Sequence, residues 1–294
     1  MDRRALAGVV ELLKPITWFA PMWAFACGVI STGLSGDGRW LVVFAGVLLA
    51  GPLVCATSQA VNDWFDRHVD AINEPARPIP SGRVPGRVGL YVAIGWTFLS
   101  LLVATTLGVW GFGAAVVGLI LAWAYSAPPV RLKRNGWWGN AAVALCYEGL
   151  PWVTGAAIMV ADGLPAWRTL VVAALYSIGA HGIMTLNDFK SVDGDSRMGI
   201  GSLPVRLGVQ NAGRVACAVM VIPQIAVVAL LFMWGRPLHG AVVGCLLVAQ
   251  LLLMARLLAS PRERAPWYNA TGTSLYVIGM LISAFALRPE MSSP

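Results

Sequence analysis

Charge is scarce in this sequence. Only 12% of its 294 residues are Asp, Glu, Lys or Arg, and 57% are hydrophobic, whereas ordinary globular domains carry about 25% charged residues. A water-soluble core could not bury this much apolar surface, so an ordinary soluble domain is excluded. The composition predicts an all-α polytopic membrane protein with lipid as its main solvent.

Residues typical of redox and hydrolytic sites are also few. The five cysteines lie in apolar stretches and form no CxxC pair, so neither a disulfide framework nor a zinc site is indicated. Nothing in the sequence resembles a Ser/His/Asp triad. The N-terminal MDRRALAGVVELLKP is too weakly apolar for a signal peptide and has no clear cleavage site. The first apolar span is therefore expected to stay in the mature protein.

Long apolar runs fill most of the chain. A helix needs about 20 apolar residues to cross the hydrocarbon of a bilayer. Nine stretches meet this requirement: 16–34, 40–61, 88–109, 111–127, 138–160, 167–187, 212–234, 239–258 and 267–287. Only WGFG separates the third from the fourth, so this boundary is the least well defined. Pro52, Pro151 and Pro223 predict kinks inside the spans.

Basic residues gather on one side of the predicted spans. All but four of the 21 Lys and Arg residues lie between alternate spans on the side of the N-terminus. By the positive-inside rule the N-terminus is cytoplasmic, and nine spans put the C-terminus on the opposite side. Cytoplasmic loops that meet anionic membrane lipid explain the net charge of +7, so no nucleic-acid partner is needed.

Two acid-rich segments fall on the predicted cytoplasmic side, although the chain has only 14 acidic residues. The first, NDWFDRHVDAINEPARPIPSG (62–82), follows the second span, and NDFKSVDGDSR (187–197) follows the sixth. Each begins with Asn-Asp and leads into a loop rich in Pro, Gly and Arg, which indicates a weak internal duplication. One such cluster is often a solvated rim at a helix end, but two in matching positions favour a binding site.

The spacing of the first motif indicates what it can bind. Asp63, Asp66 and Asp70 stand at i, i+3 and i+7, so a continuing helix places them on one face, with Asn62 one turn before Asp66. Stacked carboxylates repel one another unless a positive group lies between them. Oxygen ligands without His or Cys suit Mg²⁺, which typically takes one or two carboxylates plus substrate phosphates.

The second motif and the surrounding cations point to the same ligand. Asp188 and Asp195 are again seven residues apart, with Asp193 nearby, and Gly194 is expected to weaken the helix there. The neighbouring cations suit a ligand more anionic than a carboxylate, such as a diphosphate bridged by Mg²⁺. These cations are Arg67, Arg77, Arg83, Arg131, Lys133, Arg134, Lys190 and Arg197.

These motifs resemble a known family. NDxxDxxxD after the second span, the second Asp-rich loop, and YSAPPVRLKR after the fourth span are similar to those of the UbiA superfamily of intramembrane prenyltransferases. The resemblance covers nearly the whole chain. It implies one UbiA-type domain with a nine-helix bundle, Mg²⁺-diphosphate bound between the two Asp motifs and an isoprenoid tail in a lipid-facing cavity. Two pseudo-repeated halves, approximately 1–135 and 136–294, are expected within this domain.

A narrower resemblance lies within the superfamily. LLKPITWFAPMWAFACG, TSQAVNDWFDRHVDAINEPARPIPSGRVPG, YEGLPW and HGIMTLNDFKSVDGD are similar to the chlorophyll synthase branch, and most of all to its bacteriochlorophyll-forming members. This implies esterification of bacteriochlorophyllide a with geranylgeranyl or phytyl diphosphate in the inner membrane of a photosynthetic bacterium, with the active site facing the cytoplasm. Partners in pigment assembly are compatible with this reading, but no segment identifies one.

Residue roles follow from combining the motifs with this chemistry. The predicted catalytic residues are Asp63, Asp66 and Asp188. The predicted metal ligands are Asn62, Asp63, Asp66, Asp70, Asp188 and Asp195, with Asp193 as a seventh. The predicted diphosphate-binding residues are Arg67, Lys133 and Lys190, with Arg77 and Arg131 behind them. The propionate acceptor has a reference pKa of about 4 to 5 by analogy with Glu, so it needs no strong general base.

Three further residues are candidates for substrate binding. His181 lies seven residues before Asp188 on the same helical face, so it is predicted to point toward the site and to contact the pigment or its central Mg²⁺. Packing between helices against a backbone carbonyl is the alternative for this histidine. Glu148 lies inside the fifth span, where a charge costs about 2.5–3.5 kcal/mol, and this cost favours a functional role. Tyr125 is the first residue of the YSAPPVRLKR segment, and this position favours a site role. The alternative is an ordinary aromatic residue at the membrane interface.

Two other functions fit part of the pattern. A sister enzyme would prenylate a quinone precursor of the 4-hydroxybenzoate type, or haem. Many relatives carry DxxDxxxD in the second motif, and here Ser191 replaces the middle Asp, which argues against a quinone enzyme and is expected in the chlorophyll branch. A transporter would need charges near the bilayer midplane on broken helices, whereas only Glu148 and His181 lie deep in the predicted spans.

Overall fold

A computed structural model describes residues 3–36, 38–160 and 163–289. Every regular element in these ranges is a helix, and the one sheet-type pairing among them is an isolated bridge between Asn135 and Gly201. The all-α prediction is confirmed for the described residues.

The first half of the chain forms eight α-helices with short 3₁₀ and π segments between them. They are α1 (Arg3–Leu12), η1 (Pro15–Thr17), α2 (Phe19–Ser31), α3 (Trp40–Leu48), the π-helix η2 (Leu49–Cys55), α4 (Ala56–Asn73), α5 (Val88–Ala104), η3 (Thr105–Leu107), α6 (Gly108–Ser126), η4 (Leu132–Arg134), α7 (Gly136–Ala144), the π-helix η5 (Leu145–Gly149) and α8 (Leu150–Met159). Pro52 lies inside the π-helix η2, and Pro151 is the second residue of α8, two residues after the π-helix η5 ends, so two of the predicted kinks lie in or beside π-helical segments.

The second half contains six α-helices. They are α9 (Trp167–Asn187), followed by the 3₁₀ segment η6 (Asp188–Ser191), α10 (Val192–Arg197), α11 (Leu203–Leu207), α12 (Val209–Met233), α13 (Pro237–Ala259) and α14 (Pro261–Ala286). The expectation that Gly194 weakens the helix there is not met, because α10 continues through it and the break falls at the end of α9.

Seven helical stretches of the described chain are long and apolar enough to span a membrane. An eighth results if Arg4–Thr17 and Phe19–Ser31, which meet at a bend of 49°, form one span. The predicted third and fourth spans count together as the single stretch Val88–Ser126. The chain turns within this stretch at Gly108, whose φ of 70° is in the left-handed region that glycine adopts readily.

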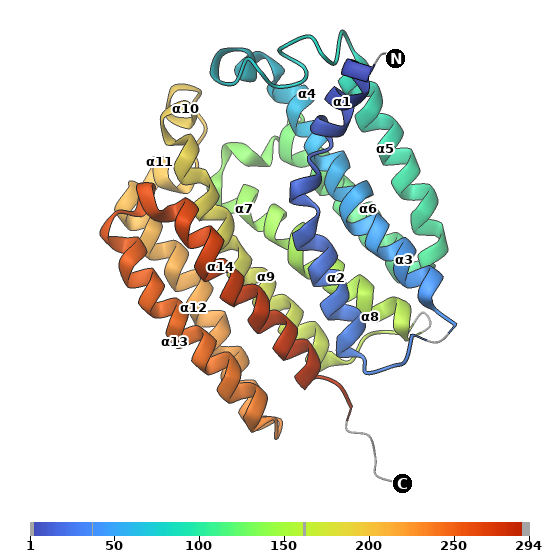
Figure 1. The fold of residues 1–294 in the computed structure, drawn as a ribbon, viewed down its shortest axis with the longest axis vertical. Coiled ribbons are helices and arrows are strands. Elements are labelled where there is room, and N and C mark those ends of the chain that lie inside the picture. Colours follow the sequence, from blue (N-terminus) through green and yellow to red (C-terminus); the bar gives the residue numbers. More distant parts are fainter. Residues whose placement is uncertain (1–2, 37, 161–162, 290–294) are drawn as a thin grey trace.

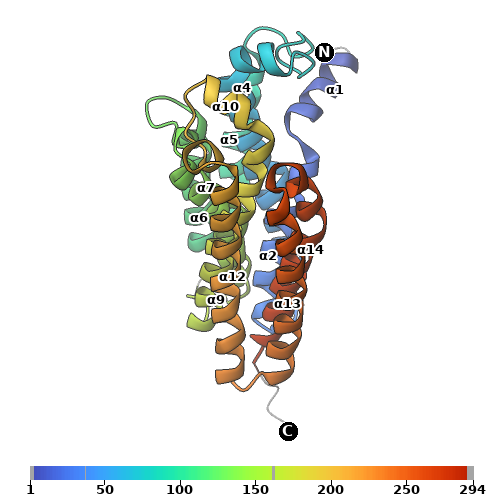
Figure 2. The ribbon, with the colours of Figure 1, turned by 90° about the vertical axis from the view of Figure 1, so that its left-hand side faces the viewer.

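The two halves of the chain lie side by side, with the later helices on the left of Figure 1. Within the second half α9 packs along α12 and α13 along α14, while α4 packs against α5 and α6 in the first. Helix α2 contacts α8 within the first half of the chain. It also contacts α14 of the second half and so joins the two halves. Figures 1 and 2 show α1, the end of α4 and α10 at one end of the molecule, and the end of α14 at the other.

Small residues let α2 and α8 approach closely. A Cβ added to Gly28 would lie 2.0 Å from the Trp152 carbonyl oxygen, and one added to Gly155 would lie 2.1 Å from that of Phe25. Close contact of backbones through glycine is a common way to pack helices in lipid, where no hydrophobic force drives them together.

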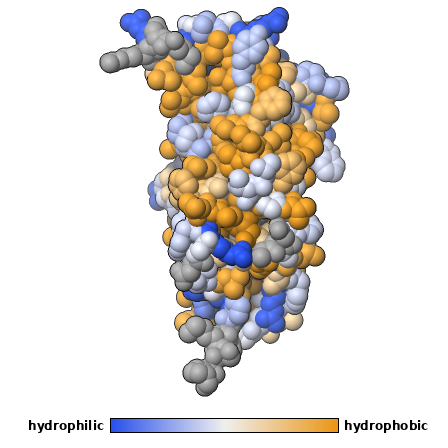
Figure 3. Space-filling model, turned by 90° about the vertical axis from the view of Figure 1, so that its right-hand side faces the viewer, coloured by the Kyte–Doolittle hydropathy of each residue, from blue (hydrophilic) through white to orange (hydrophobic). Residues whose placement is uncertain are grey.

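The outer surface of the bundle is apolar. Apolar side chains cover much of the right-hand face of the molecule, whereas hydrophilic groups lie at its upper edge and again in its lower part (Figure 3). Large hydrophobic residues are exposed on α3 and α5, among them Phe44, Phe98 and Leu102. Exposure of this kind suits lipid as the surrounding solvent, in agreement with the predicted membrane class.

Candidate active site

The two acidic motifs meet at one polar cavity of about 410 Å³. Its walls come from α4, the end of α6, η4, α7, η6 and α10. The predicted site residues that line it are Asn62, Asp66, Asp70, Arg77, Tyr125, Lys133, Asp188, Lys190 and Asp195, and Glu74 and Asn140 lie among them. Segments 125 residues apart in the chain, from Asn62 to Asn187, thus contribute to one site.

Helix α4 presents the first motif to this cavity. The helix continues unbroken from Ala56 to Asn73, as the spacing predicted. The Asn62 side-chain amide donates hydrogen bonds to Asp66 Oδ2 at 3.1 Å and to Ser126 Oγ at 3.2 Å. Lys133 forms an ion pair with Asp66, and Arg131 Nη2 lies 3.4 Å from the same carboxylate. Asp66 is therefore held by an amide on one side and by two cations on the other.

Arg77 and Lys133 supply positive charge to the cavity wall. The Arg77 guanidinium donates to Asp70 Oδ2 at 2.9 Å and to both oxygens of Glu74. These bonds hold the pKa of the Glu74 carboxyl below its usual value. The Lys133 side chain is 7% exposed, and burial lowers the pKa of its ammonium group, although the pairing with Asp66 opposes this shift.

The second motif reaches the cavity through η6 and α10. Asn140 of α7 donates to Asp188 Oδ2 at 3.1 Å and to Thr185 Oγ1 at 3.2 Å. Sequence reasoning did not identify Asn140, although a polar amide inside an apolar span is a detectable signal. Lys190 and Asp195 also line the cavity.

Six predicted site residues do not line this cavity: Asp63, Arg67, Arg131, Glu148, His181 and Asp193. Arg131 contacts its wall through Asp66, and three others have partners outside it. Asp63 is 3% exposed and pairs with Lys14 instead. Asp193 faces away and forms an ion pair with Arg262. The Arg67 guanidinium stacks 4.0 Å from the centre of the Trp64 ring and donates to that residue's carbonyl oxygen. The structure does not bring these three side chains into the cavity with the others, and their roles in the site stay predictions.

The donor set fits Mg²⁺ bound together with a substrate. Asn62, Asp66, Asp70, Asp188 and Asp195 offer oxygen ligands at the cavity, without His or Cys. In the part of the chain that the structure describes, no group of three His, Cys, Asp or Glu side chains forms a ready-made metal cage. Mg²⁺ rarely uses such a cage, since it usually keeps waters and takes phosphate oxygens from the substrate.

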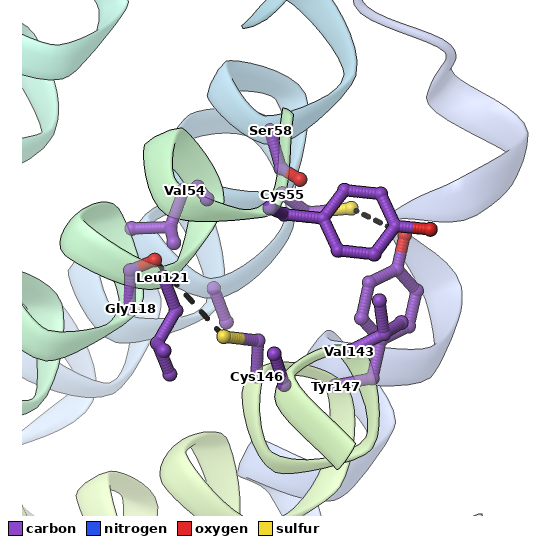
Figure 4. A pocket seen from close by; sticks show the side chains of 12 residues that line it. Val54, Cys55, Ser58, Gly118, Leu121, Val143, Cys146 and Tyr147 are labelled. Atoms are coloured by element: carbon purple, nitrogen blue, oxygen red, sulfur yellow. Dashed lines mark hydrogen bonds between the residues drawn. The ribbon is translucent and has the colours of Figure 1, made fainter. Parts of the chain in front are cut away.

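An apolar pocket adjoins the polar cavity at Tyr125, which lines both. Figure 4 shows this pocket between the helices, with Val54, Gly118 and Cys146 along its wall. It continues into a second apolar pocket that shares these three residues and Ala50. The Tyr147 hydroxyl lies at its edge, where it accepts from the Gln59 amide at 3.1 Å and contacts Cys55 Sγ at 3.4 Å.

His181 lies in a different place from the one predicted. Its Nε2 is 3.2 Å from the Trp137 carbonyl oxygen, and the two rings stack with centroids 5.5 Å apart. The histidine bounds an apolar groove of about 420 Å³ on the other face of α7, with Trp137 and Trp138. His181 therefore does not line the acidic cavity, and its contact with a backbone carbonyl matches the alternative of packing between helices.

Glu148 is enclosed in the bundle. It lies in the π-helix η5, is 5% exposed, and its Oε2 has no hydrogen-bond partner among the described residues. It lines neither the acidic cavity nor the apolar pockets next to it. This geometry therefore does not support a contact between Glu148 and a substrate. The unusual feature of Glu148 is that a carboxyl oxygen without a hydrogen-bond partner is buried inside the bundle.

Comparison with known proteins agrees with the geometry of this site. Residues 14–285 match the UbiA prenyltransferase family. The chain belongs to this family. The UbiA fold is also found in solved structures, including a UbiA homolog from Archaeoglobus fulgidus bound to DMAPP and Mg²⁺. That structure superposes with a TM-score of 0.73 at 22% identity and covers 95% of this chain and 97% of the homolog.

Within the UbiA family the chain is similar to proteins named as bacteriochlorophyll and chlorophyll synthases. The bacteriochlorophyll synthase 33 kDa chain of Cereibacter sphaeroides is 58% identical over 95% of this chain and 92% of its own length. The corresponding protein of Rhodobacter capsulatus is 52% identical over 95% and 93%. The chloroplastic chlorophyll synthase of Oryza sativa subsp. japonica is 35% identical over 94% and 76%.

Proposed function

We propose that this UbiA prenyltransferase transfers a geranylgeranyl or phytyl group from its diphosphate to the propionate carboxylate of bacteriochlorophyllide a, in an Mg²⁺-dependent reaction. The observation that carries the proposal is the 58% identity to a bacteriochlorophyll synthase over 95% of the chain. The joining of both acidic motifs at one cavity beside an apolar pocket supports it, because an isoprenoid diphosphate has one strongly anionic end and one apolar end.

The cavity residues divide into two roles in this proposal. Asn62, Asp66 and Asp70 hold the metal from α4, and Asp188 and Asp195 hold it from the second motif. Lys133, Arg77 and Lys190 bind the diphosphate directly, and Arg131 supports them through Asp66. Bound Mg²⁺ supplies positive charge to the departing phosphate oxygens. Cationic side chains already fixed in the wall stabilise the same charge without reorganisation during the reaction.

The acceptor needs little further help from the protein. A propionate is ionised near pH 7, so its oxygen attacks without prior removal of a proton. Water has to be excluded, since it would convert the allylic group to the free alcohol. Tyr125 lies where the polar cavity meets the apolar pocket. In this proposal Tyr125 lies beside the carbon that joins the diphosphate to the tail.

The membrane arrangement extends this proposal. Nine spans, a cytoplasmic N-terminus and a C-terminus on the other side are supported by the basic loops and by the turn at Gly108, which splits Val88–Ser126 into two packed helices. The cavity lies at the end where α4 and α10 meet and faces the cytoplasm from the inner membrane of a photosynthetic bacterium. Two pseudo-repeated halves, near 1–135 and 136–294, each contribute one acidic motif.

An acceptor assay tests the proposal. Purified enzyme is supplied with Mg²⁺, geranylgeranyl diphosphate and bacteriochlorophyllide a, and chromatography should detect the esterified pigment. In parallel reactions 4-hydroxybenzoate and haem replace the pigment and should remain unchanged. Prenylation of either of these acceptors without ester formation would refute the assignment to pigment synthesis while keeping the prenyltransferase activity.

A further inference from the structure

Asp63 lies behind the cavity wall and not in it. Asn62, Asp66 and Asp70 from the same helix all line the cavity, whereas Asp63 does not. Its carboxylate is 4% exposed, and its Oδ2 is enclosed by protein with no hydrogen-bond partner among the described residues. A metal ion in the cavity would reach the other three side chains of the motif without reaching this one.

Two cations from different segments converge on Asp63. Lys14 Nζ donates to its Oδ1 at 2.7 Å, and Arg77 Nη1 lies 3.5 Å from the same oxygen. The Lys14 backbone has φ 46°, in the left-handed region that a non-glycine residue rarely adopts. The Lys14 carbonyl accepts from the Thr17 hydroxyl at 2.9 Å, so the bend before α2 is fixed where the lysine reaches α4. Unusual backbone geometry of this kind persists where surrounding contacts determine it.

Arg77 connects Asp63 to the cavity. Its guanidinium lines the cavity and bonds Asp70 and Glu74. The same Nη1 that faces Asp63 donates to Asp70 at 2.9 Å, so the two carboxylates fix this nitrogen from different turns of α4. Without Lys14, Asp63 would be a buried carboxylate whose one remaining cation, Arg77, is shared with Asp70 and Glu74, which is unfavourable.

We infer that Asp63 is not a metal ligand but a positioning residue, which together with Lys14 holds the Arg77 guanidinium where it binds the diphosphate of the substrate. Lys14 neutralises Asp63 from the N-terminal segment, and Asp63 in turn orients Arg77. This inference rests on the proposed function in one respect, namely that a diphosphate is the ligand of the cavity. The sequence predicted that Asp63, Asp66 and Asp70 share one face of a helix and bind the metal together. The inference differs because it gives Asp63 a role different from that of the other two.

The test compares Asp63→Asn with Asp66→Asn, which are identical changes three residues apart on one helix. Binding of Mn²⁺ is followed by electron paramagnetic resonance at saturating inorganic pyrophosphate, and pyrophosphate affinity is measured by calorimetry at saturating Mn²⁺. Asp63→Asn should keep Mn²⁺ affinity within about twofold of the parent and weaken pyrophosphate binding by about tenfold, the effect of one charge-assisted bond. Asp66→Asn should weaken the binding of Mn²⁺ itself by at least about tenfold.

A second pair of variants tests the role of Lys14. Lys14→Met should weaken pyrophosphate binding with Mn²⁺ affinity unchanged, and the double variant Lys14→Met/Asp63→Asn should bind pyrophosphate no more weakly than Asp63→Asn alone, because the two residues act as one unit. Melting curves are recorded for all variants. If Asp63→Asn does not fold, folding of the double variant supports the pairing, and Lys14→Met still tests the effect on the anion.

Three outcomes would overturn the inference. If Asp63→Asn loses as much Mn²⁺ affinity as Asp66→Asn does, Asp63 is a metal ligand. Additive effects of Lys14→Met and Asp63→Asn would make the two residues independent. Unchanged pyrophosphate affinity in Asp63→Asn would remove the link to Arg77. If the parent enzyme binds no pyrophosphate with Mn²⁺, the proposed function itself fails, and this result is separate from all three.

Discussion

Asn140 on α7 donates a hydrogen bond of 3.1 Å to Asp188, the first residue of η6. The contact joins a helix of the apolar bundle to the second acidic motif, at a position where the α-helical hydrogen bonding of α9 ends. Because the same amide also bonds Thr185 on the last turn of α9, it fixes the carboxylate relative to the helix that carries it. Asp188 is therefore oriented by a residue outside its own motif.

Asn140→Ala should reduce kcat/KM for prenyl transfer by roughly tenfold, because a net hydrogen bond to a charged group contributes about 1.5–3 kcal/mol. The Mg²⁺ concentration needed for half-maximal rate should rise as well, since the Asp188 carboxylate loses its orientation. Asn211→Ala is the control, because Asn211 is exposed and bonds the Leu207 carbonyl oxygen away from the cavity. An Asn140→Ala enzyme with the parental Mg²⁺ dependence would contradict this role.

Asp66→Ala should abolish detectable turnover while the protein stays folded in the membrane. The carboxylate is proposed to hold the metal, and in its absence Lys133 and Arg131 are left without their shared partner. Treatment of the parent enzyme with EDTA should have the same effect, and added Mg²⁺ should restore the rate. Turnover is measured as pigment ester formed, with a melting curve to report folding. Activity that survives EDTA would argue against the metal site.

Activity should fall at high pH before an ordinary lysine would lose its proton. Burial lowers the pKa of Lys133 below its usual value of 10.5. Raising the pH through the lowered value removes the positive charge and with it part of the diphosphate binding. Lys133→Arg keeps the charge at every accessible pH, so its alkaline limit should move upward. A pH profile of kcat/KM for the two enzymes checks this, and coincident alkaline limits would refute it.

Much of the fold and the core of the site could be predicted because local rules determine them. Apolar length and turn residues identified the helical stretches, and the spacing of Asn62, Asp66 and Asp70 on a continuing helix placed these three at one cavity. Matching positions of the two motifs brought Asp188 to the same place. The predicted boundary between the third and fourth spans lies slightly too far along the chain. The turn is made by Gly108 and not by the WGFG segment that follows it.

The predicted and observed positions of some site residues differ because of long-range contacts that a local sequence pattern does not determine. Asp63 pairs with Lys14, 49 residues away, and Asp193 pairs with Arg262, 69 residues away. His181 was assigned to the face of Asp188 on the assumption of one unbroken helix. The α-helical register ends at Asn187, and Asp188 begins a 3₁₀ segment with fewer residues per turn, so equal spacing no longer means an equal direction.

Gly118 on α6 lines both apolar pockets where they meet. If these pockets hold the isoprenoid tail, as the proposed function implies, a larger side chain at this position should limit the length of the tail that fits. A Cβ added there would lie 3.4 Å from Val54 Cγ1 and 3.9 Å from Leu150 Cδ1, which are ordinary contacts, so a larger side chain would extend into the pocket. Gly118→Leu should lower kcat/KM for geranylgeranyl diphosphate by at least about tenfold, since even one methylene in an apolar pocket is worth about 1–3 kcal/mol.

The ten-carbon donor geranyl diphosphate distinguishes a blocked tail from a damaged site. Its chain is half as long and is expected to extend less far toward the junction of the two pockets, so its kcat/KM in Gly118→Leu should change far less than that of the twenty-carbon donor. Gly113→Leu is the matched control on the same helix, because nothing lies within 4 Å of a Cβ at that position, and it should leave both donors unaffected. Equal losses for the two donors in Gly118→Leu would mean that the tail takes another path through the bundle.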